Sequence, residues 1–210
     1  MTSDLATTVR FCNAARALAR VFALPGDDLD ERAALCRQAA GDDTDALAVR
    51  MRRLADRLAS SEREAFARSY ARLFLGPFEV RVPPYASWFL ETDQGMMGPV
   101  AQAAAKAYAA AGLGPADGPR ELPDHVAVEL EFCYLLGYRG LEEGDGEALA
   151  QLDGFWRDQM MPWLPAFAAA VAEHADHPAF AAAAETLRTL IEHGPAKASG
   201  LAMEGARHGS

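Results

Sequence analysis

Three residues near the middle of the chain have the types and spacing needed for acid–base chemistry. Asp124 and His125 are adjacent, and Glu129 follows His125 by one helical turn. Positions four apart share a face of a helix, so the imidazole and the second carboxylate can meet. One hypothesis is therefore a small metal-dependent hydrolase, with His174 as a possible further ligand. The structural alternative is that Asp124 caps a helix and His125 hydrogen-bonds to Glu129.

The remaining motifs give catalysis little support. The sequence has no nucleophile elbow, no third orienting group, no P-loop and no dinucleotide-binding glycine pattern. His174 and His177 lie one helical turn apart, but a metal there would need ligands from elsewhere, and a solvated polar turn is much the stronger explanation. We therefore expect no catalytic residues, no metal and no cofactor.

The stretch over residues 76–99, GPFEVRVPPYASWFLETDQGMMGP, lies between two segments with helical patterns. A connection of this length without secondary structure is uncommon in a compact helical domain, and it is usually a binding element. It contains a cluster of prolines, aromatic residues and one serine: Pro83, Pro84, Tyr85, Ser87, Trp88 and Phe89. This cluster could fasten the loop to the bundle as an apolar plug. It could also line a groove for an apolar peptide, with Met96 and Met97 as adaptable contacts.

The elements that position these residues are predicted to be helices. Alanine and leucine dominate, and apolar residues recur at three- and four-residue steps. We predict that Asp27 or Asp28 caps the second helix, Asp43 or Thr44 the third, and a Ser61–Glu64 capping box the fourth. Pro123 is predicted to start a helix that is apolar all round and hence central. The predicted helices span residues 3–24, 28–40, 44–59, 61–74, 99–113, 123–138, 147–160, 162–175 and 178–193.

Length and composition predict one all-α domain, a single-domain bundle of about eight to ten helices over residues 1–193 with a flexible tail over 194–210. The chain has 210 residues, half of them hydrophobic, which suffices for one core. Its net charge of −10 argues against a nucleic-acid partner. The three cysteines are predicted to be reduced core residues of a cytoplasmic protein. With no long apolar window and no export signal, we expect neither membrane insertion nor export of the protein itself.

Several ordered blocks resemble one known family. They are YARLFLGP over 70–77, PPYASWF over 83–89, GMMGP over 95–99, DHVAVELEF over 124–132 and FWRDQMMPWLPAFAAAV over 155–171. In residue types and order these blocks are similar to the TorD/DmsD/NarJ family of cytoplasmic chaperones for molybdenum-containing redox enzymes. The similarity spans roughly residues 70 to 190.

The resemblance implies an all-helical protein that is not an enzyme. Its partner would be the unassembled catalytic subunit of a molybdopterin oxidoreductase, or the twin-arginine signal peptide of that subunit, held during cofactor insertion and before export. An assembly factor for an unsignalled NarG-like subunit is an alternative. The family associates client recognition with positions that correspond to Leu73, Phe74, Gly76, Pro77, Pro83, Pro84, Tyr85, Ser87, Asp124 and His125. To these we add Trp88 and Glu129 on their chemistry.

A twin-arginine peptide combines two guanidinium groups with an apolar stretch, so its receptor needs carboxylates beside an apolar groove. The candidate carboxylates are Glu79, Glu91, Asp93, Asp124 and Glu129. Our hypothesis is an acidic helical body with an apolar recess framed by the proline-rich loop. A monomer and a domain-swapped dimer both remain open, as does a structural subunit that stays with its enzyme.

Overall fold

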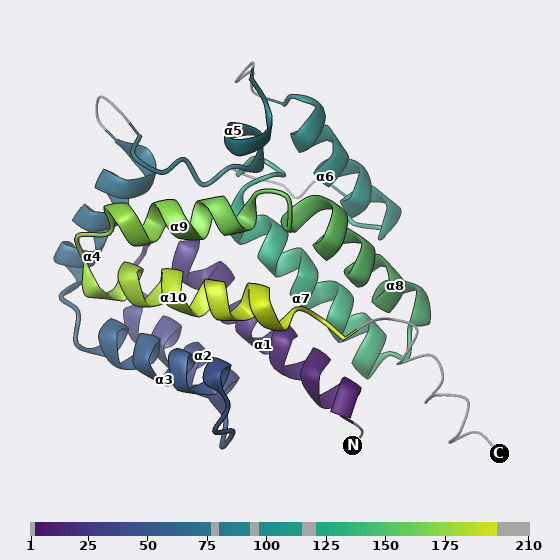
Figure 1. Cartoon of the computed structure of the whole chain (residues 1–210), viewed down its shortest axis with the longest axis horizontal. Coiled ribbons are helices and arrows are strands. Elements are labelled where there is room, and N and C mark those ends of the chain that lie inside the picture. The colour runs from purple at the N-terminus through teal and green to yellow at the C-terminus, as the bar shows by residue number, and fades with distance from the viewer. Residues whose placement is uncertain (1–2, 77–79, 93–96, 115–120, 197–210) are drawn as a thin grey trace.

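Figure 1 shows a computed structural model of the chain, and the structure describes residues 3–76, 80–92, 97–114 and 121–196. Within these ranges every secondary-structure element is a helix, which confirms the predicted all-α fold. The α-helices are α1 (Ser3–Phe22), α2 (Leu29–Ala40), α3 (Ala46–Ala59), α4 (Arg63–Tyr70), α5 (Ala86–Leu90), α6 (Pro99–Ala110), α7 (Val126–Glu142), α8 (Gly146–Phe155), α9 (Leu164–His174) and α10 (Pro178–His193). Two π-helical turns, η1 (Ala71–Leu75) and η2 (Trp156–Met160), extend α4 and α8.

Helix α7 lies between α1 and α8, as its apolar circumference predicted (Figure 1). Two glycines let its neighbours approach closely. A Cβ atom on Gly137 would lie 2.0 Å from Sγ of Cys12 in α1, and one on Gly140 would lie 2.3 Å from Cγ of Leu149 in α8. Both distances are far below van der Waals contact, so any side chain at these positions would push the helices apart.

The end of α1 is fixed to α2 by a buried arginine. Arg32 is only 1% exposed, and its guanidinium group donates to the backbone oxygen atoms of Arg20, of Ala23 at 3.0 Å and of Leu24 at 2.9 Å. Its Nε atom also donates to Oδ1 of Asp28 at 2.9 Å. The last carbonyl groups of a helix lack intrahelical donors, so this side chain serves as the C-cap of α1.

One of the predicted helix starts is right in position and two are wrong. Asp28 is the N-cap residue of α2 as predicted, although its carboxylate pairs with Arg32 and makes no capping hydrogen bond. The N-cap of α3 is Asp45, which accepts from the backbone nitrogen of Ala48 at 2.9 Å. The predicted capping box at Ser61 does not form, because the Ser61 hydroxyl donates to the preceding helix at the oxygen atom of Arg57.

Cys12, Cys36 and Cys133 are free and buried, in agreement with the prediction of core residues. Among the described residues, no helix combines the length and apolar character needed to span a membrane. Most of the predicted tail lies outside the described residues, although the backbone nitrogen of Ala196 donates to Oγ1 of Thr8 at 3.3 Å.

Candidate functional site

The described part of the 76–99 stretch is not structureless, because it contains α5. Backbone hydrogen bonds of 2.9 Å fasten the segment to the bundle, from Val82 to Leu73, from Ala86 to Asp124 and from Val126 to Pro84. Pro83 and Pro84 are buried. These contacts match the plug role, since the prolines contribute to the attachment of the loop.

Asp124 caps α5, from which it is separated by more than thirty residues, and not the helix that follows it. Its Oδ2 atom accepts from the backbone nitrogen of Ser87 at 3.0 Å. Helix α7 begins at Val126, not at the predicted Pro123, and its N-cap is His125. Both predicted capping arrangements at Asp124 and His125 were therefore wrong in their partners.

His125 is buried, and its Nδ1 atom accepts from the backbone nitrogen of Ala127 at 3.1 Å. This bond replaces the predicted one to Glu129. Burial lowers the pKa of His125, although the carboxylates of Glu121 and Asp124 act in the opposite direction. The ring of Tyr85 packs edge-on against the imidazole at 5.1 Å between centroids. The neutral imidazole is thus favoured.

Glu129 is also buried, and its Oε2 atom accepts from Nε1 of Trp163 at 3.2 Å. Burial raises the pKa of Glu129 well above its usual range, the charge of Asp124 raises it further, and the bond from Trp163 lowers it. The uncharged acid is therefore favoured. In its uncharged form Glu129 can still accept a hydrogen bond from a guanidinium group, but it offers that group no negative charge.

Each member of this Asp124–His125–Glu129 cluster has one buried polar atom without a partner. These atoms are Oδ1 of Asp124, Nε2 of His125 and Oε1 of Glu129, and none has a hydrogen-bond partner among the described residues. The same part of the chain contains no group of three or more His, Cys, Asp or Glu side chains placed to hold a metal. The geometry therefore does not assemble the ligand set that the hydrolase alternative requires.

His174 and His177, the pair one helical turn apart, occupy structural positions. His174 ends α9 and is exposed, whereas His177 is the N-cap of α10 and accepts from the backbone nitrogen of Ala179 at 3.2 Å. Between them, Asp176 pairs with Arg72 at 3.1 Å. These contacts match the solvated polar turn that was the alternative to a metal site.

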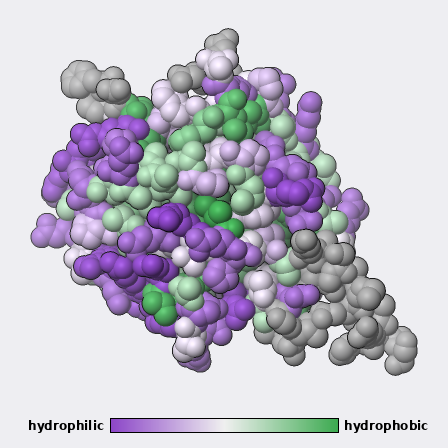
Figure 2. Space-filling view, viewed as in Figure 1, coloured by the Kyte–Doolittle hydropathy of each residue, from purple (hydrophilic) through white to green (hydrophobic). Residues whose placement is uncertain are grey.

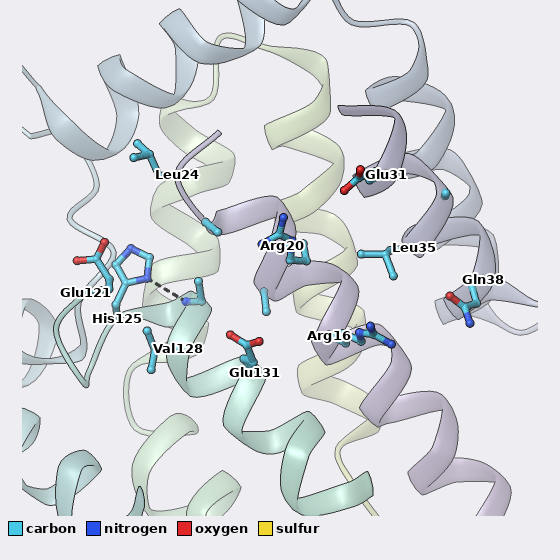
Figure 3. Close-up of a pocket in the computed structure, with 14 residues that line it drawn as sticks. Arg16, Arg20, Leu24, Glu31, Leu35, Gln38, Glu121, His125, Val128 and Glu131 are labelled. Carbon is cyan, nitrogen blue, oxygen red and sulfur yellow. Dashed lines mark hydrogen bonds between the residues drawn. The ribbon is translucent and has the colours of Figure 1, made fainter. Parts of the chain in front are cut away.

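A groove of about 930 Å³ lies beside the cluster (Figure 3). Its floor is one face of α1, formed by Arg16, Ala19 and Arg20, together with Ala23 just beyond the end of that helix. Residues of α2 and the start of α7 form its walls, and His125 belongs both to the groove and to the cluster. We call it the α1–α2–α7 groove. This groove differs from the predicted recess, because helices and not the proline-rich loop form its walls.

Other predicted site residues lie in the core. Leu73 and Phe74 are buried in η1. The ring of Phe74 packs edge-on against Phe22 at 6.1 Å and Phe180 at 5.5 Å between centroids. Full burial of such a side chain stabilises the fold by roughly 1.5–3 kcal/mol. These two residues therefore support the loop and cannot contact a client directly in this arrangement.

The rest of the predicted set is nearer the surface. Gly76 ends η1 with a φ of 51°, which favours glycine, and Pro77 lies outside the described residues. Tyr85 donates from its hydroxyl to Oε1 of Glu121 at 2.8 Å. Trp88 on α5 is 44% exposed, and Figure 2 shows apolar side chains gathered over that helix. Of the predicted aromatic residues, Trp88 is the one most available to a partner.

Of the carboxylates predicted to bind a guanidinium group, Asp124 and Glu129 are buried and two others lie outside the described residues. Glu91 accepts from the backbone nitrogen of Val100 at 2.7 Å and so caps α6. Glu79 and Asp93 lie outside the described residues. Our prediction missed Glu31 and Glu131, which line the groove. Glu131 could have been noticed as one of the few charged residues in a mainly apolar helix, whereas nothing near Glu31 marks it out.

Several known proteins are similar to this chain. A family model described as nitrate reductase delta subunit matches residues 40–169. The chaperone protein TorD of Psychrobacter sp. (strain PRwf-1) is 34% identical over 105 residues, which are 49% of this chain and 48% of that protein. The chaperone protein TorD of Vibrio parahaemolyticus is 30% identical over 128 residues, 59% of each chain. The alignments thus cover less than two thirds of both relatives.

A solved structure described as a candidate redox enzyme maturation protein from Archaeoglobus fulgidus has the same fold. The TM-score is 0.58 with 24% sequence identity, and the match covers 86% of this chain and 91% of that one.

Proposed function

Because this chain belongs to the nitrate reductase delta subunit family, the family of TorD-like redox enzyme maturation proteins, we propose that it is an assembly chaperone. Its client is the catalytic subunit of a molybdopterin oxidoreductase, held while the cofactor is inserted. Where the client carries a twin-arginine signal peptide, binding of that peptide delays export until assembly is complete. This work is done in the cytoplasm and needs no covalent chemistry.

The observation that carries the proposal is the set of unpartnered atoms beside the α1–α2–α7 groove. Buried polar groups in native proteins are nearly always hydrogen-bonded, so exceptions call for an explanation. Here Asp124, His125 and Glu129 each retain one such atom, and His125 lines the groove. A bound peptide segment that supplies hydrogen-bond partners would explain why these atoms lack them and why His125 lines the groove.

The site geometry favours binding over catalysis. Nδ1 of His125 accepts a backbone hydrogen bond, and Glu129 is held as a neutral acid. Neither group is therefore arranged as a base next to a nucleophile. The apolar surface over α5, with Trp88, gives the client a second area of contact.

Titration calorimetry tests the proposal with the leader peptide of the molybdopterin oxidoreductase encoded nearest to this gene. We expect saturable binding in the micromolar range or tighter. A pull-down with the full-length client and with a leader-truncated client then locates the recognised part. Equal capture of the truncated client would make the leader secondary and favour the NarG-like alternative. Failure to bind the peptide at high micromolar concentration, together with failure to capture either client, would refute the proposal.

A further inference from the structure

The hydrogen bonds of His125 define which ring nitrogen carries the proton. Nδ1 accepts from the backbone N–H of Ala127, so its lone pair is in use and it carries no hydrogen. In a neutral imidazole the single proton is then on Nε2. That N–H is buried and has no acceptor among the described residues. His125 is therefore a hydrogen-bond donor without a partner, and the group that satisfies it must be an acceptor.

The charged side chains of the groove favour a cationic occupant. The lining contains the carboxylates of Glu31, Glu121 and Glu131 and the guanidinium groups of Arg16 and Arg20. Arg20 is paired with Asp28 at 2.8 Å, outside the groove lining. Glu31 and Glu131 are exposed and form no ion pair or hydrogen bond with the described part of the chain. Two carboxylates are thus free to receive positive charge.

Arg16 does not compete for these carboxylates. Its guanidinium group lies over the ring of Tyr134, 4.9 Å from the centroid, and donates to the hydroxyl of the same residue at 3.3 Å. The apolar lining includes Leu24, Leu35 and Val128, which Figure 3 shows around the floor helix. An occupant must therefore have apolar as well as cationic side chains.

We propose that the α1–α2–α7 groove binds an arginine-containing peptide segment whose guanidinium groups pair with Glu31 and Glu131 and whose backbone carbonyl accepts from Nε2–H of His125. The occupant is the leader of the client, so the inference rests on the proposed function and specifies its binding mode. Glu31 and Glu131 select positive charge, and His125 fixes the register of the peptide backbone.

Three variants test the inference by calorimetry with the leader peptide. The double substitution Glu31→Gln/Glu131→Gln removes both carboxylate charges. His125→Asn keeps a good N-cap acceptor for α7 but removes the Nε2–H donor. Glu142→Gln is the control, because Glu142 is exposed on the same helix as Glu131 and does not line the groove.

We expect the double variant to bind the arginine-containing peptide roughly tenfold more weakly or worse, since charge-assisted hydrogen bonds are lost. Its affinity should also depend less on salt than that of the wild type. His125→Asn should weaken binding severalfold without changing the salt dependence. Glu142→Gln should bind like the wild type.

A second measurement does not require any variant to fold. Nitrogen-15 NMR of His125 should show the Nε2-protonated neutral tautomer in the free protein and a downfield shift of the Nε2 proton when the peptide binds. Protonation at Nδ1 in the free protein would overturn the inference. So would wild-type affinity in the double variant and in His125→Asn, although the proposed function would then stand with the leader bound elsewhere. Absence of binding to the wild type would refute leader recognition itself.

Discussion

Replacement of Arg32 by methionine should destabilise the protein more than any other arginine substitution in the first two helices. Methionine keeps most of the volume of the side chain but removes every donor. The backbone oxygen atoms of Ala23 and Leu24 then lose their donors just beyond the end of α1. Oδ1 of Asp28 loses its bond to Nε as well, although the other carboxylate oxygen atom keeps its contact with Arg20.

The size of the effect follows from the number of groups left unpaired. Removal of one member of a buried, hydrogen-bonded charge pair costs roughly 3–5 kcal/mol. The total stability of a domain of this kind is only about 5–15 kcal/mol. Arg37 on the same helix is the matched control, because its side chain is 52% exposed and its contact with Asp56 is 3.9 Å long. Arg37→Met should cost less than about 1 kcal/mol.

Urea unfolding followed by circular dichroism measures both changes as differences in the extrapolated free energy of unfolding. Arg32→Lys adds a third point, since it keeps the charge but loses the planar fork, and it should fall between wild type and Arg32→Met. Equal stability losses in Arg32→Met and Arg37→Met would refute the assignment of Arg32 as the C-cap of α1.

Gly137→Ala should destabilise the protein by about 1–3 kcal/mol in thermal or urea unfolding, because the new methyl group collides with the side chain of Cys12, whereas Gly154→Ala, with no atom near its Cβ position, should be neutral or stabilising. A stable Gly137→Ala protein would contradict the close packing of α1 and α7. Glu129→Gln should preserve the bond from Trp163 and gain stability relative to wild type as pH rises. Because the pKa of Glu129 is raised in the folded state, the wild type loses stability from about pH 4.5 upward until the raised pKa is passed, and glutamine lacks this loss. A pH-independent difference between the two unfolding curves would show that Glu129 is ionised when folded. Trp88→Ser should change stability by less than about 0.5 kcal/mol but weaken capture of the client in a pull-down, and undiminished capture would exclude α5 from the client surface.

The sequence predicted the long helices well because their signals are local. The predicted span 178–193 coincides with α10, which Pro178 opens and Gly194, at a φ of 59°, closes. The first helix and the central position of α7 were also correct. Apolar periodicity and flanking Pro or Gly are properties of neighbouring residues, and tertiary contacts did not override them.

The start of α7 and the presence of α5 depend on contacts between distant segments. Helix α5 is capped by Asp124, and Val126 donates to the backbone of Pro84, so the two segments define each other's ends. Neither partner is visible from its own sequence neighbourhood. A five-residue helix also gives too short a pattern to detect.

Adjacent positions and helical spacing predicted that Asp124, His125 and Glu129 lie close together, but they did not predict the hydrogen-bond partner of each residue. Their charge states depend on burial, which spacing does not reveal, and burial favours the uncharged form of Glu129. Glu31 is a candidate because α2 packs with α1 and α7 around one groove, and this tertiary arrangement is not visible in the local sequence.

Site-specific photocrosslinking tests most directly whether a client leader occupies the α1–α2–α7 groove. A p-benzoylphenylalanine replaces Ala34, which is exposed and lines the groove, and in a control protein it replaces Val49, which is exposed on α3. After co-expression with the full-length client and irradiation, the account predicts a crosslink from position 34 to the N-terminal leader and none from position 49. Capture of the client without a crosslink from position 34, or with equal crosslinking from both positions, would contradict it.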